Sequence, residues 1–256
     1  GKERYHIFED LVTMLLLSTC CLLALPYMVF SFTTVWDKTR SDATSHLLAK
    51  KEATFGMGCF WKPAEELLKR DGVLDTVAGY TGNPGANKKN VPPTYDNVCF
   101  GRDWVEGVRV YYDDSQISYS QLLDAFFETQ EPKFDSRQYA SIIFPHDTEQ
   151  EKDASDWLER NSRQVRTDGV AVAQTQVETL SPFYRAEGYH QNYWQKQRPR
   201  FAAILVLLII STGALDDFVP TANLVSTLHT TANAVTIGIG ILQVLERQLD
   251  AKVVEL

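Results

Sequence analysis

Residues 53–62 read ATFGMGCFWK, and the interpretation of the rest of the chain starts from this stretch. Its first six residues predict a strand that enters a turn, because glycines interrupt it at its end. Pro63 then stands where proline is favoured, in the first turn of a helix, so residues 63–70 are expected to be helical. Cys59 is therefore expected between a strand and a helix, close to the N-terminus of the helix.

The position of Cys59 suits a reactive thiol. The positive end of a helix dipole favours negative charge and lowers the pKa of a nearby thiol, and Lys62 adds a positive charge close by. The competing interpretation is a small cysteine packed into a core. Spacing alone leaves both interpretations open.

Strands and helices alternate through residues 51–197, which predicts one soluble α/β domain whose sheet is layered with helices. Further strands are expected at residues 74–80, 105–112, 139–144 and 170–178. Further helices are expected at residues 119–128, 147–166 and 187–197. In the second of these, one face carries Ala154, Trp157, Leu158 and Val165.

Composition limits the possible classes of function. The 256 residues carry a net charge of −8, which argues against a nucleic-acid partner. No pair among the four cysteines and five histidines has zinc-finger or CxxC spacing, so no metal site is expected. Cys20 and Cys21 are adjacent in an apolar run, while Cys59 and Cys99 stand alone. This is not a disulfide framework, and it indicates a reducing compartment.

Three apolar segments flank the predicted domain. Residues 11–32 carry no charge and would form a helix of about 33 Å, enough to cross a bilayer core of about 30 Å. Residues 201–215 are a second uncharged run, and residues 223–245 a third, in which Gly238 and Gly240 suit close helix contact. We interpret the first as a membrane span and the other two as a membrane hairpin. The competing interpretations are a cleaved signal peptide for the first segment and helices packed on partner proteins for all three.

Charges around the hairpin predict its orientation. Lys196, Arg198 and Arg200 precede its first run, whereas Asp216 and Asp217 lie in the short turn after it. The positive-inside rule then places the central domain on the cytoplasm-like side, which in an organelle is the stroma or the matrix.

Motifs that follow Cys59 in the chain resemble those of the peptide methionine sulfoxide reductase A (MsrA) family, in the same order and over about 140 residues. The matching segments are GMGCFW (56–61), DGV (71–73), VAGY (77–80), PTY (93–95), EGVRV (106–110), ISY (117–119), LL (122–123), SRQYAS (136–141) and AEGYHQ (186–191). The resemblance implies a two-layer, ferredoxin-like mixed sheet with helices. The apolar segments lie outside it.

The reaction of this family gives roles to the matching residues. A thiolate attacks the sulfur of methionine sulfoxide, the oxygen leaves as it is protonated, and the cysteine becomes a sulfenic acid. By resemblance Cys59 is the nucleophile, and Glu106 supplies the proton, for which it must be buried. The resemblance also gives an apolar wall for the substrate methyl group, Phe60 and Trp61, and two hydrogen-bond donors to the sulfoxide oxygen, Tyr95 and Tyr139. The alternatives are core aromatic residues, a solvated glutamate and tyrosines that only belong to the sheet.

The chain departs from the family pattern at several positions. Lys62 and Ala64 replace a small and an acidic residue, Trp104 stands where the family often has histidine, and Phe134 where many members have aspartate. No cysteine follows Cys99, although many members carry resolving cysteines in a C-terminal tail. The chain is therefore expected to have no cofactor of its own and to need an external thiol reductant of the thioredoxin or glutathione type.

Two functions remain open. In the first, residues 1–50 hold a membrane helix and linker, residues 51–197 a reductase domain and residues 198–256 a membrane hairpin and tail. Such a protein would reduce oxidised methionine in proteins. In the second, the domain is a weakly active or inactive subunit of a photosynthetic or respiratory membrane complex, where pigments or lipids are further possible ligands. The thylakoid membrane of a chloroplast, with the domain in the stroma, is favoured over the mitochondrial inner membrane.

Overall fold

The computed structural model describes residues 50–83, 92–100 and 103–256, and only the backbone of Tyr95. In this part of the chain seven strands form one sheet in the order β5-β4-β1-β3-β2-β6-β7. The strands are β1 (Lys50–Met57), β2 (Val73–Thr81), β3 (Val105–Asp113), β4 (Ser141–Phe144), β5 (Gln176–Val177), β6 (Tyr184–Arg185) and β7 (Val254–Glu255). The sheet is mixed, because β4 and β5 pair in parallel and the other neighbours are antiparallel.

The described helices are α2 (Trp61–Leu68), α3 (Tyr95–Phe100), α4 (Tyr119–Thr129), α5 (Thr148–Asn161), α6 (Tyr193–Ser211) and α7 (Ala222–Leu249). Short 3₁₀ turns lie at η2 (Val172–Gln174), η3 (Gly188–His190) and η4 (Asp216–Phe218). Side chains fix where two of the helices begin. Ser118 and Gln121 form a capping box at α4, and Asp147 accepts from the backbone N–H of Gln150 at α5.

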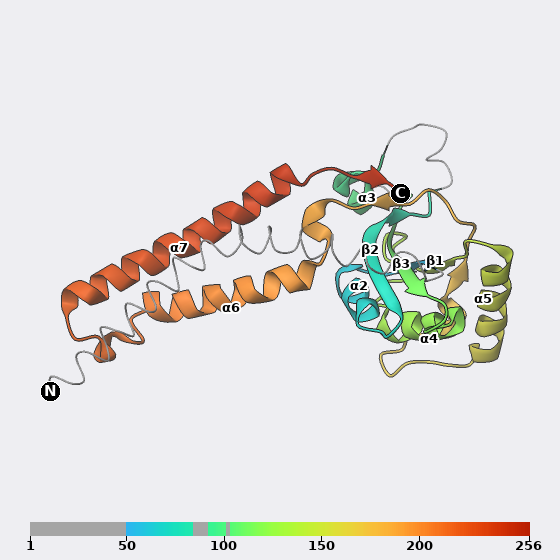
Figure 1. Ribbon diagram of the computed structural model, residues 1–256, viewed down its shortest axis with the longest axis horizontal. Helices are drawn as coiled ribbons and strands as arrows, with labels where there is room; N and C mark the ends of the chain where they lie inside the picture. Colours follow the sequence, from blue (N-terminus) through green and yellow to red (C-terminus); the bar gives the residue numbers. More distant parts are fainter. Residues whose placement is uncertain (1–49, 84–91, 101–102) are drawn as a thin grey trace. The chain divides into compact units, whose positions relative to one another are not determined.

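The core lies between the sheet and a layer of helices, in which α4 packs between α2 and α5 (Figure 1). Phe55 on β1 stacks on Phe126 of α4, with ring centroids 5.1 Å apart, and both rings are fully buried. On the other face, Phe183 fills the space above two glycines of the sheet. A Cβ at Gly79 would lie 2.4 Å from its ring, so this close packing requires glycine. The predicted α/β domain with a mixed sheet is thus confirmed.

Three expected elements differ from the structure. Residues 170–178 are not one strand but contain η2 and the two-residue β5, because residues 164–172 turn back on themselves through the Val165–Ala171 bridge. The helix expected at 147–166 ends at Asn161 for the same reason, and Val165 is 59% exposed. The helix expected at 187–197 is interrupted by Asn192, which adopts a left-handed conformation with φ 51°.

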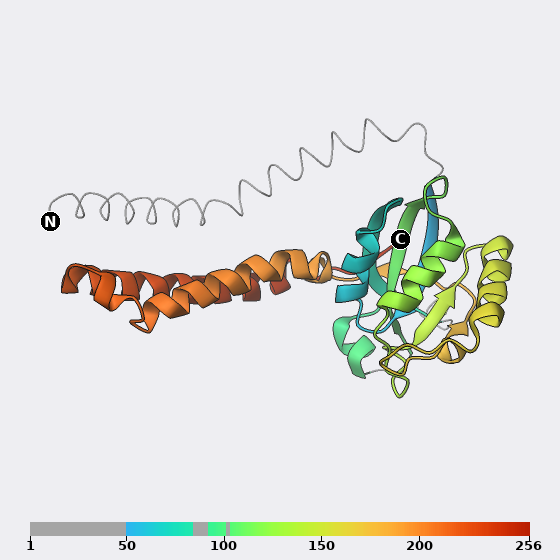
Figure 2. The same ribbon diagram turned by 90° about the horizontal axis from the view of Figure 1, so that it is seen from below.

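Helices α6 and α7 lie side by side and antiparallel in both views (Figures 1 and 2). Lys196 and Arg200 of α6 pair with Glu246 of α7 at one end, at 3.4 and 2.7 Å. At the other end His229 of α7 lies 2.9 Å from Asp216. Among the described helices, α7 is the one long and apolar enough to cross a membrane.

The expected segments fit these helices only in part. The third apolar run, residues 223–245, is helical as expected and lies within α7. Gly238 and Gly240 do not lie against α6, because a Cβ at either position would meet nothing within 4 Å. The span expected at residues 11–32, with Cys20 and Cys21, lies outside the described residues. The expected boundary after residue 197 stays a prediction, and α6 runs across it without a break.

Candidate active site

Cys59 lies at the strand-to-helix junction predicted for it, two residues after β1 and two before α2. Gly58 makes the junction possible. It has φ +78°, and a Cβ there would lie 1.9 Å from the carbonyl oxygen of Glu131. The backbone N–H of Glu131 donates to the carbonyl of Met57 at 2.8 Å, so the loop after α4 is held against the cysteine.

The Cys59 thiol is neutral in this structure. Burial raises its pKa to about 11, and the negative charges of Glu106 and Glu131 add to that effect. The backbone N–H of Trp61, at the start of α2, lowers the pKa but is outweighed. The sequence-based expectation of a lowered thiol pKa is therefore wrong for this state. Lys62, the cation expected to help, is paired with Glu131 at 2.5 Å.

Glu106 on β3 has the environment that a proton donor needs. Its side chain is buried, with 4% of the residue exposed, and burial raises its pKa to about 7. Its two carboxyl oxygens accept from the backbone N–H of Phe60 at 3.3 Å and from the side-chain amide of Gln138 at 2.5 Å. These hydrogen bonds lower the pKa, but by less than burial raises it. The expectation that Glu106 is buried is confirmed, and its raised pKa favours a partly protonated carboxyl group near neutral pH.

Sequence reasoning did not identify Gln138, which binds this acid and precedes Tyr139, or Lys133, which lies against Tyr139. Gln138 makes two hydrogen bonds with Glu106, because its backbone carbonyl oxygen also accepts from the backbone N–H of Glu106 at 2.8 Å. Its side-chain amide lies 3.5 Å from the sulfur of Cys99 as well. Lys133 donates its backbone N–H to the carbonyl of Tyr139 at 2.9 Å. For Gln138 the available signal was its position beside Tyr139 in SRQYAS.

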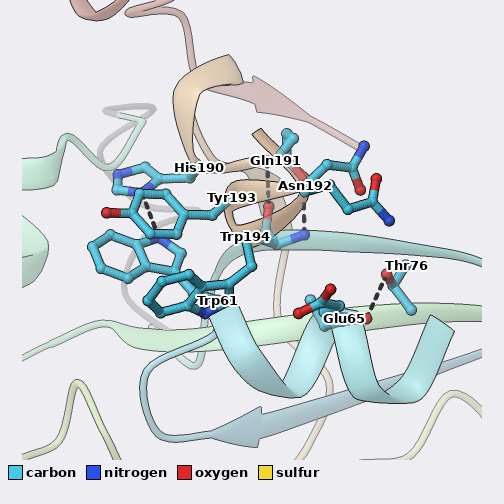
Figure 3. A pocket seen from close by; sticks show the side chains of 11 residues that line it. Trp61, Glu65, Thr76, His190, Gln191, Asn192, Tyr193 and Trp194 are labelled. Carbon is cyan, nitrogen blue, oxygen red and sulfur yellow. Dashed lines mark hydrogen bonds between the residues drawn. The ribbon is translucent and has the colours of Figure 1, made fainter. Parts of the chain in front are cut away.

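The aromatic residues after Cys59 are held from behind by the segment that leads into α6. The indole N–H of Trp61 donates to Nδ1 of His190 at 2.9 Å, and its ring stacks on Tyr193 at 3.9 Å and 5° (Figure 3). Burial lowers the pKa of His190 to about 3, so the imidazole stays neutral and Nδ1 remains an acceptor. Phe60, 1% exposed, packs on Tyr80 and His190. Phe60 is thus part of the core as well as a neighbour of the cysteine.

The predicted site residues are brought together to different extents. Cys59, Phe60, Trp61 and Glu106 are linked by direct contacts, and Tyr139 is joined to them through its neighbours. The side chain of Tyr95 lies outside the described part of the structure. A described pocket on the flank of Trp61 includes neither the cysteine nor the acid; it is lined among others by Glu65, Thr76, His190, Asn192, Tyr193 and Trp194 (Figure 3). A pocket common to all six residues stays a prediction.

Two of the departures from the family pattern occupy defined places. Trp104 is buried in the core and meets Tyr184 edge-on, with ring centroids 5.6 Å apart. Lys62 is exposed and held outward by its ion pair with Glu131. Of these two, only Trp104 therefore takes up volume inside the domain.

A buried acid beside a cysteine, on a mixed α/β sheet, is an arrangement suited to thiol-dependent chemistry. Residues 51–210 match the family model for peptide methionine sulfoxide reductase, and the chain belongs to that family, as the motifs indicated. Peptide methionine sulfoxide reductase MsrA of Pectobacterium atrosepticum is 40% identical, over 56% of this chain and 70% of the relative. The protein of that name from Methanoculleus marisnigri is 37% identical, over 57% of this chain and 90% of the relative. A solved structure, methionine sulfoxide reductase A of Corynebacterium diphtheriae, is similar with 25% identity and a TM-score of 0.48, over 60% and 77% of the two chains.

Proposed function

We propose that this protein reduces methionine sulfoxide in proteins, with Cys59 as nucleophile and Glu106 as proton donor. The main support is the buried Glu106 carboxyl group, whose pKa is raised to about 7 and which accepts a hydrogen bond from the backbone N–H of Phe60, the residue after Cys59. The Cys59 sulfur attacks the substrate sulfur while Glu106 protonates the sulfoxide oxygen. The oxygen then passes to Cys59 as a sulfenic acid, and the substrate leaves as a thioether.

Substrate binding also bears on the charge of Cys59. The resting thiol is neutral partly because Glu106 opposes a second negative charge beside it. A sulfoxide oxygen that accepts a hydrogen bond from protonated Glu106 favours the neutral acid and so removes this repulsion. The thiolate then becomes easier to form at the step that uses it. The two groups titrate as a coupled pair, so pH profiles report on both together.

The sulfenic acid must be reduced before the next turnover, and residues 100–256 offer no cysteine for this step, so an external thiol is the proposed reductant. One external thiol, of the thioredoxin or glutathione type, condenses with it to a mixed disulfide and releases water. A second thiol then frees Cys59.

Turnover with excess dithiothreitol tests this function. The full chain should reduce a methionine sulfoxide peptide, Cys59→Ser should abolish the activity, and Cys99→Ser should leave most of it. Without added thiol at most one turnover per Cys59 is expected, because the sulfenic acid accumulates. Full activity of Cys59→Ser would refute the assignment of the nucleophile.

Membrane anchoring by the α6–α7 hairpin is part of the same proposal. Between its two polar contacts at the ends of the hairpin, at Glu246 and at His229, α7 advances 17 residues, or about 26 Å. This is close to the roughly 30 Å of a bilayer core. Exposed apolar side chains lie on both helices between these ends, among them Leu205, Leu208, Ile237 and Ile241.

Carbonate extraction tests the anchor. The wild-type chain should stay in the membrane pellet, and Ile237→Arg with Ile241→Arg should shift it towards the supernatant, since a charge at the bilayer centre costs several kcal/mol. Full release of the wild-type chain would exclude an integral anchor. The charge distribution favours a domain on the cytoplasm-like side of the membrane. We favour the stromal side of a thylakoid membrane, with the matrix side of the mitochondrial inner membrane as the alternative.

The second candidate function is a structural subunit of a photosynthetic or respiratory membrane complex. The neutral resting thiol favours it, because a neutral thiol is a weak nucleophile. The exposed apolar side chains of the hairpin also favour it, because a partner subunit would cover them. A folded wild-type chain without turnover in excess thiol would select this function over the reductase.

A further inference from the structure

Lys133 occupies an unusual place beside the site. It lies in the loop between α4 and β4, where its ammonium group sits 5.0 Å from the centroid of the Tyr139 ring. Its side chain forms no ion pair with a carboxylate in the described part of the chain, whereas the neighbouring Lys62 is paired with Glu131. Lys133 is therefore a cation at the site that no described carboxylate neutralises directly.

The backbone of this loop limits where the ammonium group can go. The carbonyl of Lys133 accepts from the N–H of Ser136 at 3.2 Å, and the carbonyl of Ser136 accepts from the N–H of Tyr139 at 3.2 Å. With the Lys133–Tyr139 backbone bond at 2.9 Å, these bonds close residues 133–139 into a compact turn. Lysine and tyrosine are thereby held together, and the cation lies against the aromatic ring as cation–π attraction favours.

We propose that Lys133 is a positioning residue of the reductase site, which holds a positive charge in the loop that Glu131 ties against Cys59 and steadies the Tyr139 ring. The proposal rests on the proposed function for its use in catalysis. Its physical content, the charge in this loop, is independent of turnover.

The other charges around Cys59 show why this cation matters. Glu131, and Glu106 in its ionised form, raise the pKa of the thiol. Lys133 acts in the opposite direction, and it lowers the pKa of Glu106 as well. Removing the charge should therefore make the thiolate rarer and the acid weaker at once. The other nearby cation, Lys62, is already neutralised by its ion pair with Glu131.

Alkylation of the thiol tests the proposal without catalysis. The full chain, Lys133→Gln and Lys133→Arg are treated with iodoacetamide at several pH values. Mass spectrometry of the peptide that contains Cys59 separates its reaction from that of Cys99. Lys152→Gln serves as a control, because Lys152 is an exposed lysine on α5 paired with Asp156.

At pH 8 we expect Lys133→Gln to alkylate about three- to tenfold more slowly than the wild type, a shift of about half to one pKa unit. Lys133→Arg should restore the rate to within about twofold, because it keeps the charge and the cation–π contact. Lys152→Gln should match the wild type. Turnover of Lys133→Gln with dithiothreitol should fall by a similar factor if the reductase function holds.

Two results would overturn the proposal. One is an alkylation profile of Lys133→Gln that superimposes on the wild type. The other is a Lys133→Arg variant as slow as Lys133→Gln, which would show that the charge is not the cause. A wild-type chain without turnover, together with the expected alkylation shift, would reject the proposed function and still support the electrostatic role of Lys133.

Discussion

Large apolar side chains are buried in the α/β domain but exposed in the α6–α7 hairpin. In the domain, leucine and phenylalanine residues such as Leu122 and Phe126 are fully buried between helices and sheet. In the hairpin, Leu242 is 55% exposed and Ile237 63%. Burial of apolar surface, worth roughly 25 cal/mol per Å², therefore explains the domain from its own residues. The hairpin leaves such side chains exposed, and a covering such as the proposed membrane would remove their surface from water.

The two regions meet within α6 rather than at its end. The first residue of α6, Tyr193, stacks on Trp61 of the predicted site. One turn later, the guanidinium group of Arg198 binds both carboxyl oxygens of Glu65 on α2, at 2.5 and 2.7 Å. The first two turns of the helix thus pack on the domain, whereas the residues after Phe201 carry the exposed apolar surface.

The largest effect on turnover is expected from a substitution of Glu106, because the reaction should take place in the domain and not in the hairpin. Glu106→Gln removes the proton donor and should lower turnover by about 100-fold or more. The same variant should raise stability at pH 8. The native pKa is raised from 4.5 to about 7, so the stabilisation that protonated Glu106 provides is complete below about pH 4.5 and is lost as pH rises through 7.

Urea denaturation at pH 5 and pH 8, with a turnover assay, measures both effects. At pH 8 Glu106→Gln should be more stable than the wild type by about 1–3 kcal/mol, and at pH 5 the difference should shrink. Glu128→Gln, an exposed glutamate paired with Arg70, should change neither quantity much. Wild-type turnover in Glu106→Gln would mean that another group donates the proton.

Local sequence patterns correctly predicted the strands and helices whose residues show a clear strand or helix pattern. The strands at 74–80 and 105–112 and the helix at 119–128 match β2, β3 and α4 to within a residue or two. The failures lie where tertiary contacts decide. Residues 170–178 are rich in β-branched residues, yet the turn at 164–172 shortens the strand. The left-handed Asn192 interrupts a pattern that is otherwise helical.

The residues of the site and the raised pKa of Glu106 were predictable from the motifs, but the pKa of the Cys59 thiol was not. Cys59 and Glu106 were found by resemblance and lie in contact through Phe60, although they are 47 positions apart. The direction of the thiol pKa was wrong, because local sequence shows the helix N-terminus but not burial. Gln138 was missed because its contact with Glu106 joins two strand ends that only folding brings together.

The same leucine-to-alanine substitution in each region tests the difference between domain and hairpin directly. Leu122→Ala removes a fully buried side chain of α4 and should destabilise the domain by about 2–5 kcal/mol. Leu242→Ala makes the same change on the exposed face of α7 and should alter domain stability by less than about 0.5 kcal/mol. Urea unfolding of the full chain in mild detergent, followed by tryptophan fluorescence, measures both. Equal losses would show that hairpin and domain share one cooperative core.

The smallest expected effect lies at the junction of the two regions. Tyr193→Ala removes the ring stacked on Trp61 but leaves the Trp61–His190 hydrogen bond, so the indole should lose one of its two restraints. Such a stack is worth about 0.5–1.5 kcal/mol, which corresponds to a rise in KM of about two- to tenfold for a methionine sulfoxide peptide. The kcat should change less, because neither Cys59 nor Glu106 is touched.

Tyr193→Phe is the matched control, since it keeps the ring and loses only the hydroxyl group, and it should behave as the wild type. Steady-state kinetics with excess dithiothreitol separates KM from kcat. A rise in KM confined to Tyr193→Ala would show that the first turn of the hairpin helix supports the substrate wall. Unchanged kinetics in both variants would show that Trp61 is held by its own helix and His190 alone, and the hairpin would then be an anchor without influence on the site.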